Sequence, residues 1–320
     1  MSPQRRSTPG RSTLRLALDD YLSMRRALGY KLERPGQLLA QFVGYLDGLG
    51  AEHVTVEHAL AWATSPVGAK ECWWSLRLSA VRGFVRYLHT LDPAHQVPPV
   101  DVLPHRSHRA TPYLYSDDDI AALISAAAGL RFPLQAATYQ SLIGLLAVTG
   151  LRVGEAIRLD RADLDHTHGL LTVRHSKFGK SREVPLHPST LAALSTYLHR
   201  RDQLHPSTTP DAAALFVSTA GTRLIYANVH LTFQRLVGHA GLRPRSGSCR
   251  PRIHDLRHSF AVHTLLQAYR AGDDVQARLP LLSTYLGHVH PGSTYWYLSA
   301  APELLALAGQ RLDRSQQAPS

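Results

Sequence analysis

Cysteine is scarce in this sequence, and its scarcity limits the kind of protein this can be. Only two cysteines, Cys72 and Cys249, occur among 320 residues, and they lie far apart along the chain. Two distant cysteines without metal-ligand spacing argue against a disulfide framework and against a cysteine-rich zinc site. We therefore expect a reduced, cytoplasmic protein. Cys72 stands next to Trp73 and Trp74, and this setting predicts a core position for it.

Long hydrophobic runs are also missing. The longest purely apolar stretch, residues 145–148 extended back to Leu142, is far too short to cross a bilayer. The first residues, MSPQRRSTPGRST, are polar and basic, and no apolar segment follows them as in a signal peptide. These absences argue against export and against a membrane partner. No internal repeat is visible.

Acidic residues are fewer than basic ones. The chain has 35 Lys and Arg against 24 Asp and Glu, a formal net charge of +11, and a pI of about 9.9. A basic excess of this size favours a polyanionic partner, of which nucleic acid is the commonest. An ordinary basic protein would show the same balance, so charge alone leaves both interpretations open.

The chain divides into two regions of regular periodicity separated by a proline-rich stretch. Residues 1–98 are predicted to be a helical, DNA-binding domain, in which the fourth helix covers about residues 70–91. Residues 99–112 are predicted to be a basic linker, because prolines resist continued helix. Residues 113–312 are expected to form the second domain, and residues 313–320 a disordered tail.

Four arginines before the second domain are candidates for contact with a DNA backbone. Arg82 and Arg86 share a face of the fourth helix, four residues apart, where the alternative is a solvated surface. Arg106 and Arg109 belong to the linker, which suits a strap lying along DNA. A merely soluble linker would look similar.

The second region mixes helical and strand patterns. Ser116 to Asp119 is a capping box before an Ala/Leu-rich helix, and residues 136–148 are apolar nearly all round, as in a buried helix. Short β-type runs at 170–175 and 182–186 indicate a hairpin. Further helical patterns cover residues 189–203, 226–240, 254–269 and 279–286. We predict a mainly α-helical fold with a small antiparallel β-sheet.

Several basic residues of this region suit chemistry on a phosphodiester. Such a reaction needs cations at the phosphoryl oxygens, a nucleophile, and a proton for the leaving oxygen. Arg152 follows Gly150 in TGLRVGEA, at the predicted end of the buried helix, where Glu155 is expected to orient it or to cap the next helix. Arginine suits a phosphate because its planar fork binds two oxygens and stays protonated. Alone, Arg152 would more often be a surface residue.

The motif HDLRH places His254, Arg257 and His258 on one side of a predicted helix. Two histidines four residues apart can also bind zinc, but the motif lacks the glutamate of a metalloprotease signature and an obvious third ligand. We therefore expect no metal. Further on, LGHVHPGSTYWYLS contains two tyrosines, Tyr295 and Tyr297. Either would more often be a half-buried aromatic residue, but next to these basic residues a nucleophile is the better interpretation.

The order and local sequences of these residues resemble the tyrosine recombinase (phage integrase) family. The resemblance covers about residues 112–305 and is weaker before, where the four helices resemble the family's core-binding domain. The matching catalytic positions are Arg152, Lys177, His254, Arg257, His288 and Tyr297.

The resemblance implies a mechanism without metal or cofactor. Tyr297 would attack the scissile phosphate and form a 3′-phosphotyrosyl intermediate, while Arg152, Arg257 and His288 hold the nonbridging oxygens. His254 would assist proton transfer or orientation. Lys177 would be the general acid, and Lys180, at the other side of the hairpin turn, is left as a DNA contact.

The resemblance also implies partners. Double-stranded DNA would be bound by a dimer on each site and a homotetramer on paired sites, with accessory proteins in some systems. The apolar stretch 302–312 would pass to a neighbouring protomer or pack within its own domain.

Several functions remain open at this point. A mobile-element integrase or transposase is our first choice, and chromosome-dimer resolution of the Xer type is the second. A type IB topoisomerase-like enzyme shares the chemistry but rejoins the same strand. A DNA-binding protein without catalysis is the alternative of another class.

Overall fold

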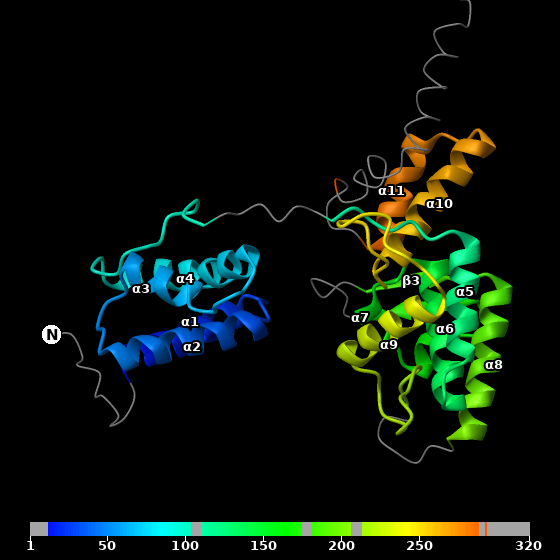
Figure 1. Cartoon of the computed structure of the whole chain (residues 1–320), viewed down its shortest axis with the longest axis horizontal. Helices are drawn as coiled ribbons and strands as arrows, with labels where there is room; N and C mark the ends of the chain where they lie inside the picture. Colours follow the sequence, from blue (N-terminus) through cyan, green and yellow to red (C-terminus); the bar gives the residue numbers. More distant parts are fainter. Residues whose placement is uncertain (1–11, 104–109, 175–180, 206–212, 288–291, 293–320) are drawn as a thin grey trace, which may run out of the picture. The chain divides into compact units, whose positions relative to one another are not determined.

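The computed structural model describes residues 12–103, 110–174, 181–205, 213–287 and 292. The chain forms two compact units, Met1–Arg109 and Ala110–Ser320. The division between them falls inside the stretch predicted to be a linker. Each unit has its own hydrophobic core (Figure 1).

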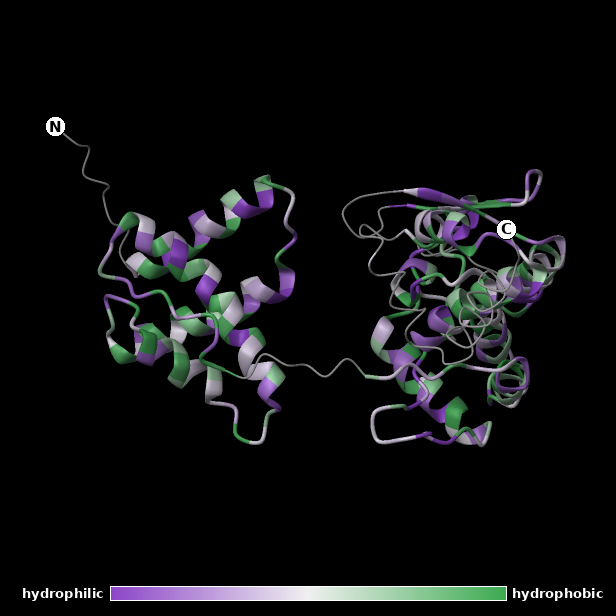
Figure 2. Ribbon diagram, turned by 90° about the horizontal axis from the view of Figure 1, so that it is seen from above, coloured by the Kyte–Doolittle hydropathy of each residue, from purple (hydrophilic) through white to green (hydrophobic). Residues whose placement is uncertain are grey.

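The described residues of the first unit form four helices, as the sequence predicts. They are α1 (Thr13–Ala27), α2 (Glu33–Leu49), α3 (Val56–Thr64) and α4 (Glu71–Leu91). Ser12 caps α1 and Thr55 caps α3 by accepting a backbone N–H in the first turn of each helix. Phe42, Phe84 and Trp62 lie in the core that the four helices enclose. Figure 2 shows hydrophobic and hydrophilic positions alternating around these helices, as amphipathic packing requires.

The prediction that Cys72 is a core residue is wrong. Cys72 lies in the first turn of α4 and is exposed. The adjacent Trp73 is only partly buried, with the Arg34 guanidinium 4.7 Å from its ring centroid. The tryptophan at the centre of the core is instead Trp62, which is 4% exposed. Neighbouring positions on a helix point in different directions, so an aromatic neighbour does not predict burial.

The described parts of the predicted linker, residues 99–103 and 110–112, contact one unit or the other. Leu103 packs against the core of the first unit, as does Val97 just before the linker. On the other side of the boundary, the Cys249 thiol lies 3.5 Å from the Pro112 carbonyl oxygen, and the Tyr113 amide donates to Asp255. Residues 104–109, which include Arg106, lie outside the described residues.

The second unit is built around a buried helix. α6 (Pro133–Thr149) packs against α5 (Asp117–Ala128), α8 (Pro188–Leu204) and α10 (Asp255–Ala271). These neighbours on several sides explain why its sequence is apolar nearly all round. The predicted capping box of α5 is confirmed, with reciprocal Ser116 and Asp119 bonds. The other α-helices among the residues described here are α7 (Val153–Ala156), α9 (Tyr226–His239) and α11 (Val275–Leu286).

A three-stranded antiparallel sheet completes this unit, in the order β1 (Leu164–Asp165), β2 (Leu170–Val173) and β3 (Arg182–Pro185). Leu171 pairs with Val184, and both are fully buried. The predicted hairpin is therefore confirmed. β1 has only two residues, too few for an alternating pattern to reveal. The mainly α-helical class with a small antiparallel sheet is confirmed.

Candidate active site

A sharp turn at the end of α6 places the first catalytic candidate. Gly150 ends the helix with a φ of 60°, and a Cβ at this position would lie 2.5 Å from the Phe260 ring. Only glycine satisfies both the left-handed backbone and this close approach. Arg152 follows as the N-cap of α7. The end of the buried helix α6 thus fixes the backbone position of Arg152.

Glu155 orients Arg152, as the sequence suggested. One Glu155 carboxylate oxygen accepts from Arg152 Nη1 at 2.7 Å, and the other accepts from the Arg152 amide at 3.0 Å. The Glu155 side chain is 1% exposed. Burial alone would raise its pKa, but hydrogen bonds and positive charge from Arg182 and Arg152 outweigh burial and lower the pKa to about 2. Glu155 is therefore ionised at neutral pH, and both of its oxygens accept from arginine donors, which suits it to orienting Arg152.

Arg257 lies between the ends of two helices. Its Nη1 donates to the Gly150 carbonyl at 2.8 Å, and its Nη2 donates to the Leu286 carbonyl at 2.7 Å. These carbonyls end α6 and α11, where backbone acceptors lack helical partners and the helix dipole is negative. Arg257 is only 2% exposed. Arg257 thus joins the end of α6, which the candidate Arg152 follows in the sequence, to the end of α11, which the candidate His288 follows.

The last carbonyls of α11 receive three arginines from three different elements. Besides Arg257 from α10, Arg152 donates to the Gly287 carbonyl at 3.2 Å. Arg182, the first residue of β3, donates to the Tyr285 carbonyl at 2.8 Å. Gly287 caps α11 with a φ of 68°. We call these three side chains the arginine cluster, Arg152, Arg182 and Arg257.

Arg182 was not among the residues singled out from the sequence. In a β-type run beside a hairpin turn, an arginine looks like an ordinary solvated strand residue. Its partners on α11 lie 103 residues away in the chain, so no local pattern announces them. A weak signal existed, because Arg182 stands at the strand end nearest to Lys177.

His254 immediately precedes α10 and is close to the same charges. Loss of hydration and repulsion by Arg257, Arg152 and Arg252 lower the pKa of His254 to about 4, and Glu155 partly offsets this. The imidazole is therefore neutral at physiological pH, and the residue as a whole remains exposed. A neutral imidazole has a ring nitrogen that can accept a proton, in keeping with the assisting role expected for His254.

The alternative of a zinc site finds no support in this part of the molecule. The His254 and His258 rings meet edge to face with centroids 5.0 Å apart. Across the described residues, no group of three or more His, Cys, Asp or Glu side chains could hold a metal ion.

Several predicted site residues lie outside the described ranges. They are Lys177, Lys180, His288, Tyr295, Tyr297, Arg106 and Arg109. His288 follows Gly287 directly in the sequence, so it is joined to the helix end that the arginine cluster contacts. The roles of all seven stay predictions.

Arg82 and Arg86 differ in the structure. Arg86 is exposed. Arg82 instead donates to three carbonyls of the segment after α4, those of Pro98, Pro99 and Val100. A phosphate contact by Arg82 would have to replace these bonds, whereas Arg86 has the exposure that such a contact needs.

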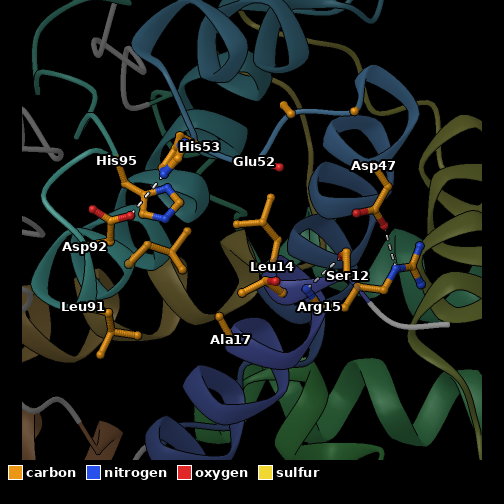
Figure 3. Close-up of a pocket in the computed structure, with 14 residues that line it drawn as sticks. Ser12, Leu14, Arg15, Ala17, Asp47, Glu52, His53, Leu91, Asp92 and His95 are labelled. Carbon is orange, nitrogen blue, oxygen red and sulfur yellow. Dashed lines mark hydrogen bonds and ion pairs between the residues drawn. The ribbon is translucent and has the colours of Figure 1, made fainter. Parts of the chain in front are cut away.

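The first unit contains a pocket with a volume of about 1080 Å³ (Figure 3). Among its lining side chains, Arg15 pairs with Asp47 at 2.7 Å and His53 with Asp92 at 3.1 Å. Its lining contains no member of the arginine cluster. The candidate active site is therefore the arginine cluster of the second unit rather than this pocket.

The helices of the described residues include none that is long and apolar enough to cross a membrane.

A mainly helical domain that gathers arginines from α7, β3 and α10 at one helix end has the features of the tyrosine recombinase class. Comparison with known proteins supports this. The model of the phage integrase family matches residues 114–303. The Sinorhizobium fredii protein y4rB, named as an integrase/recombinase, is 47% identical to this chain. The match covers 95% of this chain and 98% of y4rB. Tyrosine recombinase XerC of Alcanivorax borkumensis is 33% identical over 69% of this chain and 66% of its own.

Solved structures share the fold. The Tn1549 transposon integrase, solved in complex with transposon right end DNA, superposes with a TM-score of 0.64 at 17% identity, covering 93% of this chain and 98% of that one. A lambda integrase tetramer bound to a Holliday junction gives 0.62 at 19% identity, covering 91% and 78%. The chain belongs to the phage integrase family, whose members, the tyrosine recombinases, cleave and rejoin DNA.

Proposed function

We propose that this protein is a site-specific DNA recombinase that cleaves and rejoins DNA through a 3′-phosphotyrosyl intermediate formed by Tyr297. The observation that carries the proposal is the convergence of Arg152 and Arg257 on the end of α11, directly before His288 in the sequence. Both arginines were expected to bind phosphate, and they come from elements far apart in the chain.

The charge of the site suits the reaction. The arginine cluster carries three positive charges and Glu155 one negative charge, which leaves two positive charges in the described centre. A phosphodiester carries one negative charge, and a second develops on its nonbridging oxygens as the nucleophile adds. Fixed cations that match the developing charge stabilise the transition state more than the ground state.

The residues take the following roles in this mechanism. The Tyr297 oxygen forms a bond to phosphorus as the bond from phosphorus to the 5′ oxygen breaks. Neutral His254 assists removal of the tyrosine proton, and Lys177 supplies a proton to the leaving 5′ oxygen. Attack by the 5′ hydroxyl of a partner strand then reverses the chemistry. The phosphotyrosyl bond conserves the energy of the phosphodiester, so neither cofactor nor metal is required.

The DNA partner is bound by both units in this proposal. The first unit is the core-binding domain, with Arg86 as its best described phosphate contact. The basic excess of +11 supports a duplex partner. Arg106, Arg109 and Lys180 are proposed as further contacts, and accessory proteins are left open.

Assembly into a homotetramer on paired sites is proposed to use a groove between α10 and α11. The groove has a volume of about 520 Å³ and an apolar lining that includes Phe260, Leu265 and Leu282. Leu281 lines it too and is 64% exposed. The sequence after α11 contains one apolar stretch, residues 302–312, and we propose that this stretch of a second copy fills the groove.

The assembly is tested with Leu281→Glu. We expect this change to prevent assembly of paired sites, measured by native mass, while cleavage of a single site remains. Retention of the assembly by Leu281→Glu would place the stretch within its own protomer or elsewhere.

The biological role proposed first is integration or transposition of a mobile element, in the cytoplasm. The long match to y4rB and the shared fold of the Tn1549 integrase support it. Dimer resolution is the second candidate, because tyrosine recombinase XerC is also a relative. A topoisomerase-like enzyme would cleave DNA without exchanging strands between duplexes. An inactive DNA-binding protein would not cleave it.

Covalent trapping tests the proposal. Nicked suicide duplexes tiled from the DNA flanking the gene are incubated in EDTA with the wild type, Tyr297→Phe and Tyr295→Phe. A denaturant-resistant adduct lost only in Tyr297→Phe supports the mechanism and locates the cleavage site. Tight binding to one tile with no adduct on any tile would favour a DNA-binding protein without catalysis.

A further inference from the structure

Arg182 makes more contacts in the site than its position on a short strand suggests. Its side chain is 13% exposed. Nη1 and Nη2 donate to the two Glu155 carboxylate oxygens at 3.2 and 2.9 Å, and Nε donates to the Tyr285 carbonyl at 2.8 Å. One guanidinium thus joins β3, the start of α7 and the end of α11.

Glu155 is shared between two arginines of different character. The same two oxygens that bind Arg182 also bind the Arg152 side chain and the Arg152 amide. Arg152 is a proposed phosphate ligand and its side chain is 26% exposed, twice the exposure of Arg182. Arg182 therefore holds the inner side of the carboxylate, and the carboxylate holds Arg152.

The last turn of α11 gives Arg182 a second connection to the site. A Cβ at Gly287 would lie 3.0 Å from Arg182 Nη1, so the guanidinium packs directly against the helix cap. Arg152 donates to the carbonyl of the same Gly287. When Arg152 engages a phosphate, this bond competes with the new one, while the Arg182 bond to Tyr285 involves no phosphate ligand.

We infer that Arg182 is a positioning residue for DNA cleavage, acting on the Arg152 guanidinium through Glu155 and the end of α11. This inference rests on the proposed function. An arginine is needed because only its planar fork binds both carboxylate oxygens and a carbonyl together. Burial and the ordering of Glu155 between two guanidinium groups keep Arg152 in one place before DNA arrives, which is the preorganisation that charge stabilisation requires.

The test measures single-turnover cleavage, by the wild type and by Arg182→Lys, of the nicked suicide duplex on which the wild type forms its adduct. Lysine keeps the charge but cannot make all three bonds. We expect cleavage to slow by roughly 10- to 100-fold, since misplacing a reacting group by about 1 Å costs up to ~100-fold. Duplex binding and the thermal midpoint should change little. Arg182→Gln is the second variant if the lysine protein does not fold.

Two altered substrates distinguish a positioning role of Arg182 from a general loss of order in the active site. A methylphosphonate replaces one charged nonbridging oxygen by a methyl group, so it needs less help from Arg152. We expect the ratio of wild-type to Arg182→Lys rates to fall towards one on this substrate. A sulfur in place of the 5′ bridging oxygen needs no general acid, and the defect should persist on it. Lys177→Ala is the reference for the opposite pattern.

The matched control is Arg174→Lys. Arg174 follows β2 in the same sheet and also binds a buried carboxylate, Asp163, but contacts neither Glu155 nor α11 in the described residues. Its cleavage rate should equal that of the wild type.

Each outcome decides between the claims. Wild-type cleavage by a folded Arg182→Lys protein would overturn the inference, as would an equal defect on all three substrates or relief by sulfur alone. A wild type that forms no adduct would overturn the proposed function, and this inference with it.

Discussion

The two units each bury an arginine against helix-end carbonyls, yet only one of these arginines belongs to the proposed reactive site. Arg77 in the first unit is 7% exposed and donates to the Trp62 carbonyl near the end of α3. Arg257 in the second unit is 2% exposed and donates to carbonyls that end α6 and α11. Burial and partner type are alike, so neither distinguishes structure from function.

The surroundings of the two arginines differ. Arg77 lies 3.7 Å from the centre of the Trp62 ring, a neutral partner that only stabilises its charge. Arg257 shares the end of α11 with Arg152 and Arg182, and the Glu155 carboxylate binds the latter two. Packing like charges together costs folding free energy unless an anion arrives. An excess of buried positive charge, rather than one buried arginine, therefore indicates the site for a phosphate.

The largest effect is expected from Arg257→Lys. A lysine keeps the charge but cannot reach two carbonyls and a phosphate with a planar fork. Loss of one preorganised donor slows catalysis by about 100- to 1000-fold in other enzymes, and we expect a loss of this size in single-turnover adduct formation. Duplex affinity, measured in parallel, should fall much less. Cleavage within the error of the wild type would remove Arg257 from the reaction.

Glu155→Gln should produce the largest loss of stability. The change leaves Arg152 and Arg182 without the carboxylate between them, and breaking a buried ion pair costs about 3–5 kcal/mol. Urea unfolding at neutral pH measures this loss. A decrease below about 1 kcal/mol, the scale of an exposed pair, would contradict the arrangement.

The acid stability of Glu155→Gln provides a second measurement. The folded-state pKa of Glu155 is about 2, below its ordinary value of 4.5. Its ionised form therefore stabilises the fold above pH 4.5, and this contribution is lost as the pH falls from 4.5 towards 2. The difference in unfolding free energy between wild type and Glu155→Gln should narrow over that window.

His254→Asn should reduce the pH dependence of the unfolding free energy in a different pH window. The folded-state pKa of His254 is about 4 and its ordinary value is 6.5. The neutral form is favoured in the fold, so its contribution is complete above pH 6.5 and is lost as the pH falls towards 4. The measurement is the difference between the unfolding midpoints of wild type and variant. This difference should change as the pH falls from 7.5 to 4.5. Parallel profiles would show that His254 does not carry this shift.

The sequence predicted the long elements better than it predicted which side chains pair with one another. Residues 136–148 were expected to be a buried helix, and α6 covers them. Cys72 was misplaced because its burial depends on the direction of one position in α4. Arg182 was missed because its partner Tyr285 belongs to another element, 103 residues away. Periodicity reports which side of an element is apolar, whereas charge pairing depends on which elements meet.

Arg77→Met tests the other half of the comparison and should have the smallest effect on the reaction. The change removes the contact with the Trp62 ring and hydrogen bonds to the Trp62 carbonyl and Ser65, worth about 1–3 kcal/mol together. Thermal unfolding should show this loss in the first unit. At saturating duplex and below the unfolding transition, single-turnover cleavage should equal that of the wild type, because Arg77 stabilises a neutral core and supplies no charge to a phosphate. A cleavage defect that persists at saturating DNA would show that buried arginines of the first unit also act in the reaction, and the distinction by excess charge would fail.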